Sequence, residues 1–450
     1  MKVVVFAVSI LLPLQSPADF APEDLLAELN EIRVEESVPV LAVTTFRDGK
    51  VEFSSVLGDG TVDTPLRWGS ITKTFTGLAL SKAIRDRDIA WDRPVRKLVD
   101  DPPWTNTWVE TNPVRVQDLA YLCAGMTDLS FSEFNDNTPQ TLADRLKVPR
   151  KIVWPPGLQH NYTNVTPGIS AWLVERLTGE PFHDYIEAHV LAPLGMTKAS
   201  LDPVPGLPGG FKADGMSEIP YWHMTFTAFG ALNASLAEMT KATQRILNSE
   251  LHPLDMARLR SAGCMAEGEP PLPIGYGAGH YGRVRHGYVW YGHGGDADGY
   301  RSRYALLPEH GRGYIVLINT DNPQLLRRLE SILERYVVRD LNPPKQDMPD
   351  YTTDIQQWAG DYYPSGVRFG VKRWRSGENR RVSIEINGRH LTLRNRDRTT
   401  ELIPLGDGLF RRTNDPIPTL RFLKREGDVF LQGELGNYFK LDTCPEWFCE

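Results

Sequence analysis

The order in which strand-like and helix-like segments follow one another constrains the fold of this chain most. Residues 40–46 and 51–56 are β-rich runs on either side of an Asp-Gly pair, which tolerates the positive φ angles of a tight hairpin turn. Residues 314–318 indicate a buried strand, and an amphipathic helix over 324–337 follows it. Between these ends, from about 100 to 250, proline-rich loops alternate with short helices. This order predicts one sheet built from both ends of a domain, with a helical subdomain beside it.

A different pattern begins after residue 340. Residues 341–350 contain three prolines and no apolar periodicity, which predicts a linker. Beyond the linker, apolar and polar residues alternate over 382–386, an Asn-Gly pair turns the chain, and the alternation resumes on the return. We therefore predict a mixed α/β domain over 19–340, with an antiparallel sheet flanked by helices, and a small all-β antiparallel barrel over 351–450.

The first 18 residues have the pattern of an export signal. Lys2 precedes an almost unbroken apolar run over 3–14, and small residues follow it. A run of about 12 apolar residues is too short to span a bilayer but suits a signal peptide. A first core strand is the alternative, and Pro13 and Pro17 disfavour it because they interrupt strand pairing. We interpret 1–18 as a signal peptide and expect a periplasmic or secreted protein.

Charge and composition exclude several functional classes. The net charge is −7, and Lys and Arg are interspersed with Asp and Glu, so no basic face suggests nucleic-acid binding. No segment after the N-terminal run is apolar enough to predict a stable membrane span. The ten histidines include no His-Glu-x-x-His motif, which disfavours a metallohydrolase. No Gly-x-Ser-x-Gly elbow is present, which disfavours an α/β-hydrolase. We expect neither a metal nor an organic cofactor.

The four cysteines leave their pairing open. Cys444 and Cys449 are near enough in sequence to close a small loop, whereas Cys123 and Cys264 can pair only if the fold brings them together. Disulfides form in exported proteins, and neither pair has zinc-ligand spacing with histidines. Disulfides and buried free thiols remain the two alternatives.

One serine of the chain is followed by a lysine three positions later, the pair Ser70 and Lys73. Positions i and i+3 share a helix face, so the amine lies beside the hydroxyl if Ser70 opens the apolar helix that begins there. A serine hydroxyl needs a base within hydrogen-bond reach, and a shielded lysine can lose its proton near neutral pH. The helix N-terminus also favours a developing oxyanion. These residues predict a nucleophile and its base, although an N-cap serine with an exposed lysine would show the same spacing.

A second motif, Tyr162-Thr163-Asn164, follows a Pro-Pro-Gly turn. A tyrosine beside a lysine can share its proton and act as the general base or its relay. An asparagine offers one acceptor and two donors, which suit the orientation of a substrate amide. We predict these roles for Tyr162 and Asn164, against the alternative of an ordinary loop tyrosine.

A third motif, His293-Gly294-Gly295, follows about 130 residues later. Glycines let a strand backbone approach a ligand closely. The backbone N–H of Asp296 can then join that of Ser70 as a two-donor oxyanion hole. We predict that His293, Gly294 and Gly295 position the substrate, and that the histidine faces the leaving-group side of the substrate. A glycine-rich turn with a surface histidine is the alternative.

The three motifs in this order resemble the class C β-lactamase and D-Ala-D-Ala carboxypeptidase branch of the serine β-lactamase and penicillin-binding-protein superfamily. The resemblance extends over roughly 22–340 and includes the nucleophile segment 68–76, the Pro-Leu-Gly-Met of 193–196 and the segment 293–300. It implies an α/β (α+β) fold of the β-lactamase/transpeptidase type. The tail is similar to the lipocalin-like domain that follows many such hydrolases, through Trp358, Gly360 and Tyr362.

Two departures from the family pattern affect the expected activity. His293 stands where β-lactamases usually carry lysine, and a lysine there helps hold a substrate carboxylate, whereas histidine is mostly neutral at pH 7. This disfavours efficient β-lactam hydrolysis and favours peptidases and esterases. Residues 122–125 read Leu-Cys-Ala-Gly where the family often has His-Thr-Ser-Gly, which we interpret as a change in packing.

The resemblance implies a serine hydrolase that works through an acyl-enzyme. The expected substrates are short peptides with D-residues, of the D-Ala-D-Ala carboxypeptidase or D-aminopeptidase type. A carboxylesterase of the same fold is the close alternative. A catalytically silent protein that binds peptidoglycan fragments is a third, and the presence of Lys73 and Tyr162 disfavours it.

Overall fold

The computed structural model describes residues 21–134, 136–260, 264, 272, 274–344, 355–364, 381–388, 390–396, 398–425, 427–433 and 436–440. The signal peptide expected over 1–18, most of the linker expected over 341–350, and both Cys444 and Cys449 lie outside these residues. Residues 341–344 form neither helix nor strand.

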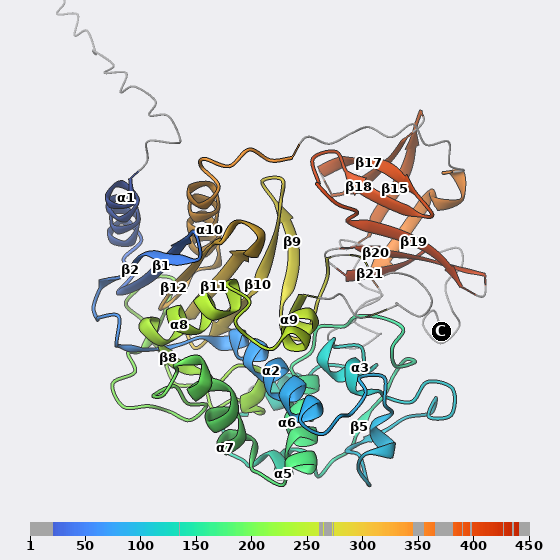
Figure 1. The fold of residues 1–450 in the computed structure, drawn as a ribbon, viewed down its shortest axis with the longest axis horizontal. Coiled ribbons are helices and arrows are strands. Elements are labelled where there is room, and N and C mark those ends of the chain that lie inside the picture. The colour runs from blue at the N-terminus through green and yellow to red at the C-terminus, as the bar shows by residue number, and fades with distance from the viewer. Residues whose placement is uncertain are drawn as a thin grey trace, which may run out of the picture.

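A six-stranded antiparallel sheet forms the centre of the larger domain (Figure 1). Its strands, in sheet order, are β2 (Lys50–Gly58), β1 (Val40–Arg47), β12 (Arg312–Ile318), β11 (Tyr300–Leu307), β10 (Tyr288–Ala297) and β9 (Tyr281–Arg285). The predicted hairpin is β1–β2, and β1 pairs with β12 although the two are far apart in sequence. The sheet is therefore built from both ends of the domain, as its sequence predicted.

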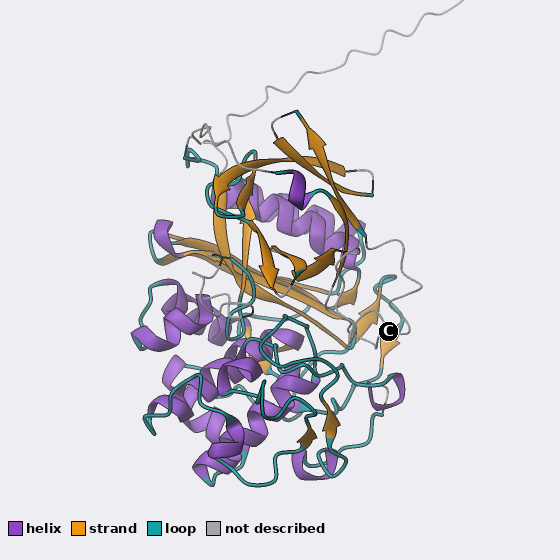
Figure 2. Ribbon diagram, turned by 90° about the vertical axis from the view of Figure 1, so that its right-hand side faces the viewer, coloured by secondary structure: helices purple, strands orange, loops and turns teal. Residues whose placement is uncertain are grey.

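Helices cover both faces of this sheet because both faces of β1 are apolar. Leu41 and Val43 pack with α1 (Pro22–Glu35) and α10 (Pro323–Val337), whereas Val40 and Ala42 point to the opposite core. At the start of α10, the Asn322 side chain accepts a hydrogen bond from the N–H of Leu325 at 3.0 Å, a typical N-cap. The helices of the opposite face form the helical subdomain below the sheet in Figure 2. They are α2 (Thr72–Arg85), α3 (Val116–Ala120), α4 (Phe131–Phe134), α5 (Leu142–Arg145), α6 (Val165–Thr178), α7 (Phe182–Ile186), α8 (Leu236–Leu247) and α9 (Pro253–Arg260).

Short strands connect the loops of this subdomain. They are β3 (Pro65–Arg67) with β8 (Asn233–Ser235), β4 (Trp104–Thr105) with β5 (Arg150–Lys151), and β6 (Gly210–Lys212) with β7 (Glu218–Ile219) and β13 (Thr320–Asp321). None of the helices in the described ranges is long and apolar enough to cross a membrane.

The C-terminal region is a closed antiparallel barrel of eight strands beside the β9 edge of the sheet (Figure 1). Its strands are β14 (Gly360–Pro364), β15 (Val382–Asn387), β16 (His390–Asn395), β17 (Arg398–Gly406), β18 (Leu409–Arg412), β19 (Leu420–Arg425), β20 (Asp428–Gly433) and β21 (Gly436–Lys440). Trp358 stacks on Phe422 inside it, with ring centroids 5.3 Å apart. Val382 and Ile384 are buried as predicted, but burial does not alternate along β15, because Ser383 between them is also buried and Ile386 is 48% exposed.

Candidate active site

Ser70 lies in a single 3₁₀ turn, Gly69–Ile71, that leads directly into α2. Lys73 belongs to the first turn of that helix, and its Nζ lies 3.0 Å from Ser70 Oγ. The lysine is only 2% exposed, because α2 is buried between the sheet and the other helices of the subdomain. The i, i+3 spacing thus places the amine beside the hydroxyl, as expected, and burial shields the amine from water.

Two further oxygens surround the Lys73 amine. Nζ lies 2.9 Å from Asn164 Oδ1 and 2.9 Å from the backbone carbonyl of Phe229. Only the neutral form of the amine can act as a base, and in that form donation to these two oxygens would direct its lone pair toward the Ser70 hydroxyl. The arrangement can therefore accept the proton of Ser70. Sequence reasoning assigned Asn164 to the substrate, and the structure also places its side chain against the lysine.

Asn164 is held in place from the opposite side. It is the residue before α6, and its backbone N–H donates to Asp128 Oδ1 at 2.6 Å. Asp128 is buried, so this carboxylate anchors the start of the helix inside the protein. Sequence reasoning missed Asp128 and the Phe229 carbonyl. Neither residue belongs to a recognisable motif, and only the tertiary packing brings each of them to the site.

Tyr162 belongs to a group of aromatic rings above the lysine. Lys73 Nζ lies 4.9 Å from the Tyr162 ring centroid, within the range of a cation–π contact. The Tyr162 ring stacks on Tyr281 with centroids 6.0 Å apart and meets Tyr276 edge-on at 5.9 Å. The predicted tyrosine–lysine pair is thus present, and the two additional tyrosines come from the segment just before β9 and from β9 itself.

His293 is buried against the same rings and is 2% exposed. Its Nδ1 lies 2.6 Å from the Gly294 carbonyl, to which it can only donate, and its Nε2 lies 3.3 Å from the Tyr276 hydroxyl. Burial, followed by the nearby charge of Lys73, lowers the pKa of His293 well below its ordinary value. The ring is therefore neutral, and the position that a lysine usually holds carries no charge.

The backbone of β10 approaches the Ser70 turn very closely. A Cβ on Gly295 would lie 1.8 Å from the Trp68 carbonyl oxygen, and one on Gly69 would lie 2.6 Å from the Asp296 nitrogen. Glycine is therefore required at both positions for this contact. The contact brings the backbone of Asp296 next to the turn that carries Ser70, where the sequence predicted a two-donor oxyanion hole.

A cavity of about 630 Å³ opens beside Ser70. Its lining includes every predicted site residue except Lys73, which is buried behind Ser70 and contacts it. The barrel contributes residues that sequence reasoning did not identify, namely Pro364, Gln432, Gly433 and Asn437. The cavity is therefore enclosed jointly by the larger domain and the barrel.

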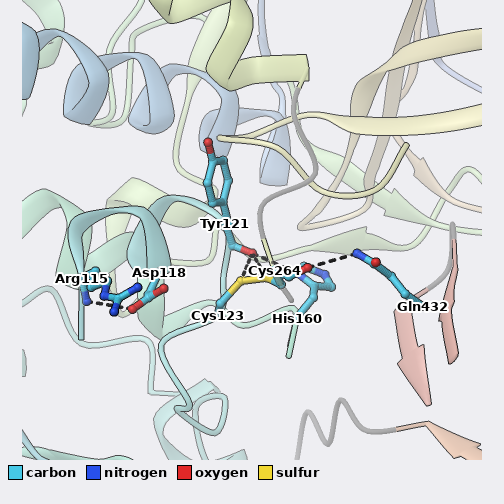
Figure 3. The surroundings of a disulfide bond; sticks show 7 residues. All are labelled: Arg115, Asp118, Tyr121, Cys123, His160, Cys264 and Gln432. Atoms are coloured by element: carbon cyan, nitrogen blue, oxygen red, sulfur yellow. Dashed lines mark hydrogen bonds between the residues drawn. A yellow bond between two sulfur atoms is a disulfide. The ribbon is translucent and has the colours of Figure 1, made fainter. Parts of the chain in front are cut away.

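Cys123 and Cys264 form a disulfide at the wall of this cavity (Figure 3). On one side, Gln432 of the barrel donates to the Cys264 carbonyl at 3.1 Å. On the other, the Cys123 and Leu122 carbonyls accept from the chain that leads to Tyr162, at 2.9 Å each. The segment 122–125, interpreted from sequence as a change in packing, is thus cross-linked to the cavity wall through Cys264. Among the described residues, no group of His, Cys, Asp and Glu side chains could hold a metal ion.

Comparison with known proteins identifies related chains. A family model described as Beta-lactamase matches residues 23–338. A hydrolase of Aspergillus campestris, named Unguisins hydrolase ungD', is 26% identical over 285 residues, which cover 58% of this chain and 53% of that protein. A protein of Escherichia coli K12, named as a candidate D-alanyl-D-alanine carboxypeptidase, is 26% identical over 147 residues, covering 30% of this chain and 33% of its own.

A solved structure extends the likeness to the whole architecture. The structure titled "Crystal structure of SurE with D-Leu" superposes with a TM-score of 0.57 at 20% identity, covering 93% of this chain and 99% of that one. At this identity the match supports the fold alone. The chain spans about half the length of the fungal hydrolase that it matches.

Proposed function

This chain belongs to the beta-lactamase family of serine hydrolases, and from this premise we propose that it is a peptidase acting on short peptides with D-residues. The observation that carries the proposal is the Ser70–Lys73 contact of 3.0 Å, buried at the base of a cavity and flanked by Tyr162. A silent binding protein has no need of a buried amine in hydrogen-bond contact with this hydroxyl.

The proposed reaction begins with proton transfer from the Ser70 hydroxyl to neutral Lys73, directly or through Tyr162. Ser70 Oγ attacks the substrate carbonyl, and the backbone N–H groups of Ser70 and Asp296 stabilise the oxyanion that forms. Collapse expels the leaving amine, which takes the proton from the base. A water molecule then attacks the acyl-enzyme, returns a proton to Ser70 and releases the acid.

Three observations support a D-peptide substrate of limited size. The barrel residues Gln432 and Asn437 close one side of the cavity, which restricts the length of chain that can enter. One relative is named as a D-alanyl-D-alanine carboxypeptidase candidate. The neutral His293 lacks the positive charge that favours β-lactam substrates.

We also propose that the protein acts outside the cytoplasm, because the Cys123–Cys264 disulfide suits an oxidising compartment.

A fluorophosphonate probe tests the nucleophile. We expect a single covalent adduct that mass spectrometry of peptides places on Ser70, and none in Ser70→Ala. Ser132→Ala, at an exposed serine of α4, is the matched control and should label like the unmodified protein. Equal labelling of Ser70→Ala, or an adduct elsewhere, would overturn the assignment.

A panel of chromogenic substrates then tests the substrate class. We would compare kcat/KM for five compounds: D-alanine p-nitroanilide, its L-enantiomer, a peptide ending in D-Ala-D-Ala, a p-nitrophenyl ester and nitrocefin. We expect a D-peptide to be preferred over its L-counterpart by at least tenfold. A p-nitrophenyl ester that exceeds every peptide, with no preference for D-residues, would replace the proposal by a carboxylesterase.

A further inference from the structure

A second cavity of about 560 Å³ adjoins the first at the β9 edge of the sheet. It is bounded by β9, β10 and β11, by α10, and by the beginning of β17 in the barrel. Four residues line both cavities: Tyr281, Arg283, His293 and Arg303. The two cavities therefore share a wall, and that wall carries two guanidinium groups.

Arginine side chains dominate the second cavity. Among the described residues that line it, five are arginines and two are glutamates, and the arginines are Arg283, Arg285, Arg303, Arg327 and Arg398. Both glutamates already have partners, since Glu330 pairs with Arg303 at 2.5 Å and Glu334 pairs with His286 at 3.2 Å. The lining thus has an excess of positive charge, supplied by the sheet, by α10 and by the barrel.

The strand register explains how two of these arginines reach the catalytic cavity. Arg303 lies opposite Gly294 on the neighbouring strand, and a Cβ on Gly294 would lie 2.1 Å from an Arg303 guanidinium nitrogen. The absence of a side chain at 294 therefore lets the guanidinium lie against β10, next to His293. The Arg283 guanidinium lies 4.9 Å from the Tyr281 ring centroid, and that ring stacks on Tyr162.

We propose that the two cavities form one substrate cleft, in which the arginine-lined cavity is a subsite for a carboxylate at the far end of the substrate. This proposal rests on the proposed function and names the substrate class more closely, as an anionic peptide. A guanidinium binds a carboxylate through two parallel hydrogen bonds, which gives both affinity and orientation. The subsite lies on the α10 side of the sheet and includes Arg398 of the barrel, so it is complete only when the two domains are joined.

A matched pair of substrates tests the subsite. Two peptide p-nitroanilides that differ only in a free carboxylate or a carboxamide at the distal end should be compared by kcat/KM. A charge-assisted hydrogen bond contributes enough for a change of about tenfold or more. We expect the full-length protein to prefer the carboxylate by at least tenfold, and this preference to fall as ionic strength rises.

Single variants locate the effect. Arg283→Gln and Arg398→Gln should each reduce the carboxylate preference by about tenfold. Arg394→Gln is the matched control, because Arg394 is a barrel arginine outside the cavity that pairs with Glu385 at 2.6 Å. Its preference should equal that of the unmodified protein.

Labelling of Ser70 by an uncharged fluorophosphonate separates the two proposals. If the unmodified protein is not labelled, the proposed function fails. If it is labelled but hydrolyses both anilides equally, or if Arg394→Gln loses as much preference as Arg398→Gln, the anion subsite fails and the proposed function stands.

Discussion

The Cys123–Cys264 disulfide should make a large contribution to stability. It cross-links residues 141 positions apart, so it removes many conformations from the unfolded chain. The chain-entropy relation, −2.1 − 1.5R ln n cal/mol/K with n near 141, gives about 5 kcal/mol at 25 °C. Losses on removal of native disulfides are about 2–5 kcal/mol. We therefore expect Cys123→Ala/Cys264→Ala to lose about 2–5 kcal/mol of unfolding free energy.

Urea unfolding followed by tryptophan fluorescence measures this loss, from the midpoint and slope of the transition. The unmodified protein should be compared with the double variant, each with and without reductant. Both proteins keep Cys444 and Cys449, so the effect of reductant on the double variant is the control for any change outside the Cys123–Cys264 bond. The change in unfolding free energy on adding reductant, minus the same change in the double variant, is the contribution of the Cys123–Cys264 bond.

The disulfide also connects the barrel contact of Gln432 to the chain before Tyr162, so its loss should raise KM more than it lowers kcat. The reasoning is refuted if reductant shifts the midpoint of the unmodified protein no further than that of the double variant. It is equally refuted if the double variant keeps its unfolding free energy within about 0.5 kcal/mol, the size of an ordinary surface substitution.

The remaining predictions concern the base, the buried histidines and the barrel wall. Lys73→Met should lower kcat/KM by about 10² to 10⁴, as loss of a general base does, and adding it to Ser70→Ala should cost little more, which steady-state kinetics of the three variants will check. Burial lowers the pKa of His280 from 6.5 to about 3, and burial with Lys73 lowers that of His293 in the same direction. Because the unfolded chain binds protons on both histidines below about pH 6.5 and the folded chain does not, unfolding free energy should fall by up to about 1.4 kcal/mol per pH unit for each as the pH drops from 6 to 5. Urea unfolding at pH 5 and pH 6 should show that the unfolding free energy of His280→Gln depends less steeply on pH than that of the unmodified protein. An unchanged pH dependence would contradict the burial argument. Gln432→Ala should raise KM several-fold with kcat nearly unchanged, and an effect confined to kcat would argue against a wall that only shapes the cavity.

Local pattern was sufficient for much of the fold and for the centre of the site. The hairpin β1–β2 and the strands β15 and β16 follow from alternation around Asp-Gly and Asn-Gly turns, which need only neighbouring residues. Ser70 and Lys73 meet because three positions make nearly one helical turn, whatever surrounds them. These features were predictable because their geometry is set within a few residues.

Other features depended on the tertiary structure. The Asn164 side chain reaches Lys73 across 91 residues, and Gln432 reaches Cys264 across 168. Ile386 continues an alternating pattern yet is exposed, as are its neighbours Glu385 and Asn387 at the end of β15. Such contacts depend on which distant segments the packed core brings together, and no local periodicity encodes that choice.

The sequence by itself determined that a serine and a lysine share one helix face, that a glycine-rich strand follows, and that a β-domain ends the chain. Only the tertiary structure decided that the pKa of His293 lies well below its ordinary value, since the shift depends on burial and on the nearby Lys73. It also decided that a disulfide and the barrel enclose the cavity, and that arginines from the sheet, α10 and β17 converge next to it. Burial and long-range proximity are properties of the packed molecule, and they set the charge and shape of the site that the motifs only locate.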